Sequence, residues 1–230
     1  MAVAYDNFGT TTAGTTTRTI SAFTPVGTPR GAIVFIIQSN QTDEISGVTY
    51  GGVAMTEVTG SPNAKATGQV GTVYAYFLGA SIPPGAQDIV CTASGTTGTK
   101  QPFVYSLTAD ADTELVDQDA TINTDSAENP SITLSHGGRT CFDALSFISG
   151  QLAVSGVDVL AGWSVQNETD GGPFVYGCYK HDTPGTSDVS AGLTQTAEDA
   201  LVIAVAVSEV VAGGGGSVPS RRNTLMGVGR

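Results

Sequence analysis

The sequence predicts an all-β fold, a jelly-roll-like sandwich of two sheets with about ten to twelve strands and extended termini. Three observations predict it. Short apolar runs rich in Val, Ile, Thr, Tyr and Phe recur along the whole chain and are bounded by turn-forming residues. Hydrophobic residues make up 40% of the chain and charged residues 13%, with 30 glycines available for tight turns. Stretches with helical spacing are scarce, because glycine or proline interrupts them.

Individual runs indicate where each strand lies in a sheet. The segments "AIVFII" (32–37) and "ALVIAVAV" (200–207) are apolar on both faces, which predicts central strands in sheets that are covered on both sides. The segment "VDQDATI" (116–122) alternates apolar and polar residues, as a half-solvated antiparallel strand does. In "TYGGV" (49–53), two glycines can supply the positive φ angles of a two-residue hairpin turn.

One internal echo stands out within this pattern. Both "CFDALSFIS" (141–149) and "AEDALVIAVAVSE" (197–209) place Asp-Ala-Leu just before an apolar strand. The echo marks either two equivalent strands of a duplicated sandwich or a coincidence.

The charge is unevenly distributed along the chain. The net charge is −12, yet all 21 acidic residues precede Gly213, and three of the nine basic residues follow it. A body this acidic disfavours nucleic acid and anionic membranes as partners. We therefore divide the chain into an N-terminal arm or edge strand (1–19), a sandwich domain (20–212) and a glycine-hinged basic tail (213–230).

The three cysteines, Cys91, Cys141 and Cys178, are far apart and form no CxxC pair. We expect buried free thiols rather than a disulfide framework or a zinc site. No signal peptide is visible, so synthesis in a reducing cytoplasm is expected. The longest apolar run is too short to cross a bilayer.

No catalytic or cofactor-binding residues are predicted. The two histidines, His136 and His181, lie in segments typical of turns, and no GxSxG motif accompanies any serine. The acidic stretch "DADTELVDQD" contains the best ion-site candidates, Asp110, Asp112 and Glu114. They indicate either a calcium site or a solvated acidic edge that discourages aggregation.

Two carbohydrate-related functions stay open as alternatives. Trp163 can serve as a sugar-stacking platform of a tail or fibre adhesin, or as a core residue. A concanavalin-like glycoside hydrolase is the second alternative, since two carboxylates can flank a glycosidic bond, although the strand signature of such enzymes is missing.

The segments "VTYGGVAMTEV", "GTVYAYFLGASIPPGAQDIVCTASG" and "SVPSRRNTLMGVGR", in an acidic chain rich in Gly, Thr and Ala, resemble accessory virion proteins of tailed bacteriophages. The resemblance is one of texture over most of the chain. It implies a capsid decoration or cement protein that is made in the bacterial cytoplasm and resides in the virion. It also implies a homo-oligomer, with trimers common in the class, and the major capsid protein or another virion protein as partner.

In that role the tail is the expected docking element. Gly213 and the glycines after it form a loose joint, and five tail residues form the grip. Arginines can pair bidentately with carboxylates, while Leu and Met anchor by apolar contact. The docking residues are Arg221, Arg222, Leu225, Met226 and Arg230.

Overall fold

The computed structural model describes residues 3–64, 71–123, 129–139, 143–152, 159–170, 174–182, 185–194 and 197–210. These ranges contain seventeen strands and no helix. The first ten are β1 (Ala4–Thr10), β2 (Arg18–Phe23), β3 (Pro29–Gln38), β4 (Ile45–Tyr50), β5 (Val53–Ala54), β6 (Thr56–Glu57), β7 (Asn63–Ala64), β8 (Thr72–Leu78), β9 (Gln87–Ala93) and β10 (Lys100–Thr108). The others are β11 (Thr113–Asn123), β12 (Ser131–Leu134), β13 (Asp143–Leu152), β14 (Trp163–Asp170), β15 (Phe174–His181), β16 (Val189–Gly192) and β17 (Ala197–Glu209).

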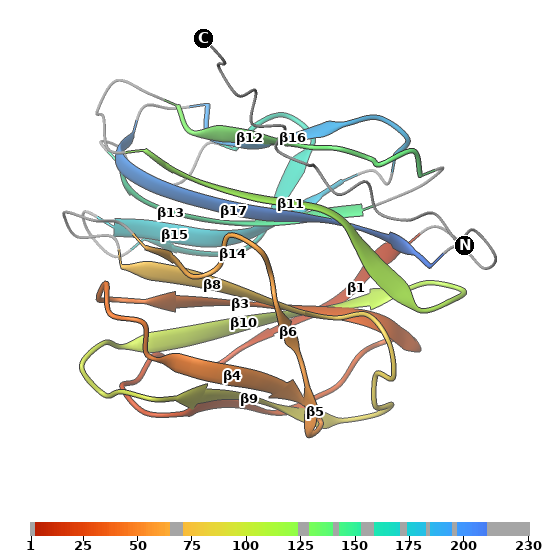
Figure 1. Cartoon of the computed structure of the whole chain (residues 1–230), viewed down its shortest axis with the longest axis horizontal. Helices are drawn as coiled ribbons and strands as arrows, with labels where there is room; N and C mark the ends of the chain where they lie inside the picture. Colours follow the sequence, from red (N-terminus) through yellow and green to blue (C-terminus); the bar gives the residue numbers. More distant parts are fainter. Residues whose placement is uncertain are drawn as a thin grey trace, which may run out of the picture.

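The strands form four antiparallel sheets that stack as layers (Figure 1). The two large sheets, β1-β10-β3-β8-β6 with β7 beside β8, and β11-β17-β13-β15-β14, lie in the middle. The small sheet β2-β9-β4-β5 covers one outer face, and β12-β16 covers the other. The all-β sandwich prediction is confirmed. However, the described residues have four layers instead of two, and their strand order does not confirm a jelly-roll-like connection.

Three hydrophobic cores separate the four layers. The central core lies between the two large sheets and includes Phe35, Phe103 and Phe147. One outer core lies beneath β2-β9-β4 and the other beneath β12-β16. Strands β3 and β17 contribute alternate residues to the central core and to an outer core, so each is buried on both faces. This arrangement confirms the prediction that "AIVFII" and "ALVIAVAV" are doubly covered central strands.

The hairpin prediction is also confirmed. Tyr50 pairs with Val53 across the β4–β5 turn, and Gly51 and Gly52 between them have φ angles of 55° and 82°. Only glycine takes two such consecutive angles without steric cost.

The two halves of the chain repeat the same strand arrangement. The first large sheet has the order β1-β10-β3-β8, and the second has the order β11-β17-β13-β15. Position by position, β1 corresponds to β11, β10 to β17, β3 to β13 and β8 to β15. The outer pairs also correspond, because β2 pairs with β9 as β12 pairs with β16. An isolated bridge between Val159 and Leu193 stands where β4 pairs with β9 in the first half. The described chain is therefore a duplicated sandwich.

Local details repeat along with the topology. Strand β1 has a register shift between Tyr5 and Asn7, and β11 has one between Leu115 and Asp117. After the shift, the Asn7 Oδ1 accepts a hydrogen bond from the next backbone N–H at 2.9 Å. The Asp117 Oδ1 does the same, also at 2.9 Å. A bulge conserved in position and in hydrogen bonding supports the equivalence of the two halves.

The Asp-Ala-Leu echo does not mark this duplication. Its two strands, β13 and β17, are neighbours in one sheet, where Ala144 pairs with Ala206. The counterpart of β13 in the first half is β3, and the counterpart of β17 is β10. The repeat is visible in burial, since Ile33 and Phe35 of β3 face the central core as Leu145 and Phe147 of β13 do.

A buried ion pair closes one end of the first half. The Lys100 Nζ lies 2.5 Å from the Glu44 Oε2, and the Lys100 side chain is fully buried. The ammonium also donates to the carbonyl oxygens of Thr15, Gly95 and Gly98. These contacts join the β1–β2 connection, the segment before β4 and the β9–β10 connection. In the second half no such pair exists among the described residues at this place, because the counterpart of Lys100 is an alanine of β17.

Candidate functional site

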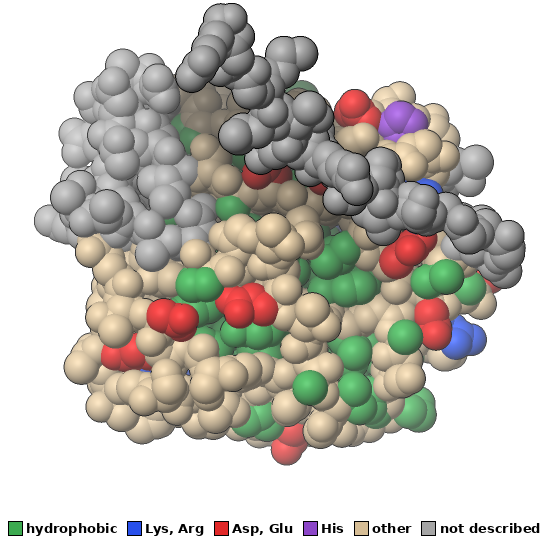
Figure 2. Space-filling model, in the orientation of Figure 1, with side chains coloured by type: hydrophobic (Ala, Val, Ile, Leu, Met, Phe, Trp, Pro, Cys, Tyr) green, Lys and Arg blue, Asp and Glu red, His purple; other side chains and the backbone are tan. Residues whose placement is uncertain are grey.

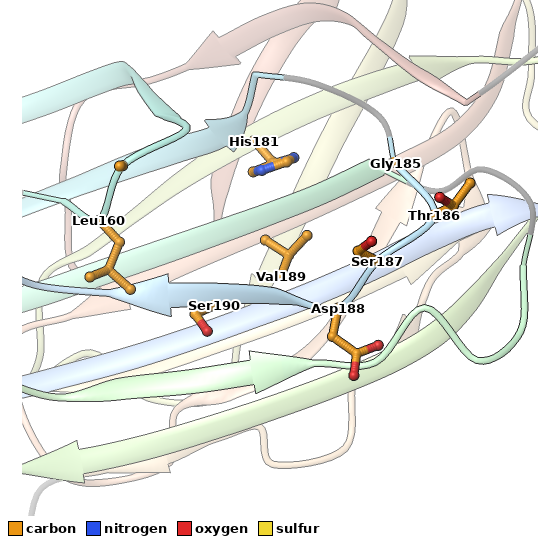
Figure 3. Close-up of a pocket in the computed structure, with 9 residues that line it drawn as sticks. Leu160, His181, Gly185, Thr186, Ser187, Asp188, Val189 and Ser190 are labelled. Atoms are coloured by element: carbon orange, nitrogen blue, oxygen red, sulfur yellow. The ribbon is translucent and has the colours of Figure 1, made fainter.

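A pocket of about 520 Å³ opens in the second half of the chain, at the β15–β16 connection. Figure 3 shows His181, at the end of β15, and Val189, at the start of β16, directed toward the same space. The loop between these strands contributes Gly185, Thr186 and Ser187 to the lining. The pocket therefore has a mixed surface that includes an imidazole, branched apolar side chains and hydroxyl groups.

The hydroxyls of the pocket loop are available to a ligand. Thr186 and Ser187 are exposed, and neither side chain makes a hydrogen bond within the described part of the chain. Val189 is half-buried, because it packs against the outer core beneath β12-β16. The wall is thus anchored in the core, while the polar groups face solvent.

Two hydrogen bonds between His136 and Asp188 hold the far side of the pocket loop. The His136 Nδ1 lies 2.7 Å from the Asp188 Oδ1, and the His136 backbone N–H donates to the same oxygen at 3.0 Å. These hydrogen bonds lower the pKa of the Asp188 carboxyl. Figure 3 shows the Asp188 side chain pointing away from His181, toward the other side of the strand. Asp188 thereby fixes the loop to the turn after β12.

Trp163 lies beneath the pocket instead of on its surface. Its side chain is only 8% exposed and packs in the outer core. The indole N–H donates to the Ser190 carbonyl at 2.8 Å, and the ring meets the His181 ring edge-on at 5.5 Å. Of the two interpretations of Trp163, sugar-stacking platform and core residue, this burial favours the core residue.

The acidic candidates for a calcium site do not converge. Asp112 faces Arg30 at 3.9 Å, and Glu114 forms an ion pair with Arg139. The Asp110 backbone N–H donates to the Glu209 carboxylate at 2.5 Å. No group of three or more His, Cys, Asp or Glu side chains that could hold a metal occurs in the described ranges. Asp110, Asp112 and Glu114 instead lie along a partly solvated edge, which is the second of the two interpretations given above.

The thiols lie where the apolar patterns indicate. Cys91 and Cys178 are free and buried, and burial raises the pKa of the Cys91 thiol to about 12. These thiols are unsuited to nucleophilic work at neutral pH. Cys141 lies outside the described residues.

The five expected docking residues of the tail also lie outside the described residues. The described chain ends at Val210, whose backbone N–H donates to the Asp112 carbonyl at 2.8 Å. The last described residue is thus hydrogen-bonded next to the acidic edge formed by Asp110, Asp112 and Glu114. Within the described ranges, no helix is long and apolar enough to cross a membrane.

The sequence predictions missed the pocket, although a signal for it exists. The segments "VYAYFLGASIPPGAQD" (73–88) and "VYGCYKHDTPGTSD" (175–188) begin alike but end differently. The first has Ile82 before two prolines, whereas the second has one proline among Asp, Thr and Ser residues. Recognising the duplication would have directed attention to this difference.

Comparisons with models of protein families, with curated proteins and with solved structures give no match for this chain.

Proposed function

We propose that this protein is a non-catalytic structural protein of a virion, a decoration protein that attaches to the shell through its C-terminal tail, residues 213–230. The observation that carries the proposal is the position of Val210. This residue directly follows β17, a central strand that is buried on both faces, and it is the last described residue before the tail. A docking segment rooted in a rigid strand transmits load to the whole body.

Charge supports the same role. Figure 2 shows acidic side chains scattered over one face of the body with few basic ones between them. The tail has the opposite sign, with Arg221, Arg222 and Arg230 and no acidic residue. Like-charged bodies repel one another, whereas each tail can pair with carboxylates on a neighbour. Contacts through tails suit repeated copies on a common shell, in line with the expected homo-oligomer.

The four-layer body suits a mechanical role. Its three cores and its buried Lys100–Glu44 pair tie distant segments of the chain together. The glycoside hydrolase alternative gains no such support, because the pocket lining includes a single carboxylate, Asp188, where that reaction uses two.

Incorporation into particles tests the proposal. We would compare the intact chain with a variant lacking 213–230 in particles of a phage that encodes it. The deletion should reduce the copies per particle by about tenfold or more, while the melting temperature of the purified protein stays unchanged. Equal incorporation of the shortened chain would overturn the proposal.

A matched pair of variants separates charge from geometry. In R221Q/R222Q the positive charges are lost, whereas R221K/R222K keeps the charge but loses the bidentate fork. Incorporation should fall most for the glutamine variant and less for the lysine variant. If the glutamine variant is incorporated like the intact chain, these arginines are not the grip.

A further inference from the structure

The pocket at the β15–β16 connection lies at a place where the two equivalent halves of the chain have different residues. In the first half, the corresponding connection joins β8 to β9. There Leu78 and Ile82 pack against the outer core. Pro83 lies close to the β4–β5 turn, where a Cβ on Gly51 would be 3.0 Å from the Pro83 Cγ. The first half thus fills with apolar side chains the space beside its outer core.

The second half changes the residues that fill this space. Ile33 of β3 corresponds to Leu145 of β13, and these residues pair with Phe77 and Lys180, respectively. Phe77 and Lys180 are therefore equivalent, and so are the residues that follow them, Leu78 and His181. The loop after His181 has the exposed polar residues Asp182, Thr186 and Ser187, whereas the loop after Leu78 has the apolar residue Ile82. The second half therefore has an imidazole and two exposed hydroxyl groups where the first half has apolar side chains. Such replacement opens a concavity without disturbing the duplicated core.

We infer that this pocket binds a single neutral pyranose unit, as a free sugar or within a polysaccharide. A volume of about 520 Å³ lies within the range of small-ligand sites. A pyranose ring has an apolar face suited to Val189 and the His181 ring. Its hydroxyl groups suit the Thr186 and Ser187 hydroxyls and the imidazole nitrogens, which donate and accept.

The charges around the pocket argue for a neutral sugar. Among the described residues, the lining contains no Lys or Arg, the side chains that bind anionic sugars and phosphates most strongly. The charged side chain of the lining is the acidic Asp188, whose carboxylate disfavours an anionic ligand. This inference concerns the body and is independent of the tail, so it stands or falls separately from the proposed function.

Sugar binding can be followed through Trp163, the single tryptophan of the chain. Because its ring meets His181 at 5.5 Å, occupation of the pocket should change its fluorescence. The probes are the methyl glycosides of glucose, galactose and mannose, with glucuronate and N-acetylneuraminate as anionic counterparts. At least one neutral glycoside should bind with a Kd in the millimolar range or tighter, and the anions should bind about tenfold more weakly or not at all.

Variants of exposed residues keep the test clear of folding defects. The double variant T186A/S187A should weaken sugar binding by about tenfold, because each lost hydrogen bond contributes modestly. The variant H181L, which restores the residue type of the first half, should abolish the fluorescence response and the binding measured by calorimetry. The matched control is S21A, which removes an exposed hydroxyl from β2, and it should bind like the intact chain. Failure of all neutral glycosides to bind, tighter binding of the anions, or full binding by T186A/S187A would each overturn the inference.

Discussion

Phe35 and Phe147 occupy equivalent positions in the two halves of the chain, and their ring centroids lie 5.9 Å apart at the centre of the shared core. The pairing registers agree, since Phe35 is opposite Phe103 in β10 and Phe147 is opposite Ile203 in β17. The two sandwiches therefore meet through equivalent residues, as the subunits of a symmetric dimer do.

Truncation of this contact should destabilise both halves together. Phe147 is fully buried and its ring also lies near Phe103 and Tyr176. We expect F147A to lower the free energy of unfolding by about 3 to 5 kcal/mol. Denaturant unfolding followed by circular dichroism should keep a single transition. The control V165A changes an exposed side chain and should shift stability by less than about 0.5 kcal/mol. Two separate transitions in F147A would show that the halves do not share one core.

The buried Lys100–Glu44 pair should respond strongly to the loss of one partner. The variant K100M fills similar space but leaves the Glu44 carboxylate without its cation. We expect K100M to lose about 3 kcal/mol or more of stability, because an unpaired buried charge is costly. Thermal unfolding at neutral pH measures the loss. The double variant K100M/E44Q should recover part of it, and no recovery would mean that the pair acts mainly through packing.

Asp143 should make stability depend on pH in an unusual direction. Burial raises the pKa of this carboxyl to about 6, while hydrogen bonds from Ala144 and Tyr5 lower it less. The folded state therefore binds the proton more tightly than the unfolded state. Stability gained through Asp143 increases as pH falls from about 6 to about 4, and the ionised form costs about 3 kcal/mol above that range.

The variant D143N isolates this contribution from all other carboxylates. The asparagine keeps an acceptor oxygen and lacks the charge. D143N should be more stable than the intact chain at pH 8, and the difference should shrink on acidification through pH 6. Urea unfolding at pH 4, 6 and 8 measures the difference. A constant difference across this range would contradict a raised pKa at Asp143.

Glu44 should contribute the opposite dependence at lower pH. Its hydrogen bonds to Lys100 and Thr97 lower the pKa of the Glu44 carboxyl to about 2. The stabilisation is therefore fully present above its ordinary value of 4.5 and is lost as pH falls toward 2. Unfolding of E44Q between pH 5 and pH 2 should depend less steeply on pH than that of the intact chain. Identical slopes would rule out Glu44 as a cause of acid unfolding.

Trp163 should report a buried environment. Since its indole is 8% exposed, the emission should be shifted to the blue of free tryptophan and resist quenching by iodide. The same measurement in urea supplies the exposed reference. Solvent-like emission from the folded protein would restore Trp163 as a candidate surface platform.

The sequence predicts the fold class and the doubly buried strands because both follow from residue pattern. Residues 200–207 are apolar on both faces of the strand, so both faces need to be covered, as they are in β17. The number of layers does not follow from such a pattern, because the same run suits any sheet with two covered faces. The bulge at Val116 illustrates a second limit. It places Val116 against the outer core and Ala120 against the central core, although an unbroken strand would put both on one face.

The candidate site could be predicted least. Trp163 and the acidic residues stand out by residue type. However, Trp163 is buried, and Asp112 and Glu114 are paired with arginines. The pocket depends on a difference between two equivalent loops, which is visible only when the halves are aligned by strand pairing. Residues such as Thr186 and Ser187 are common in loops and give no signal alone.

A reconstruction of purified particles by cryo-electron microscopy tests the structural role most directly. The account predicts copies of the four-layer body at symmetry-related positions on the shell, with density running from Val210 onto a neighbouring subunit. Particles that lack the protein, or bodies attached with Val210 facing away from every neighbour, would contradict it.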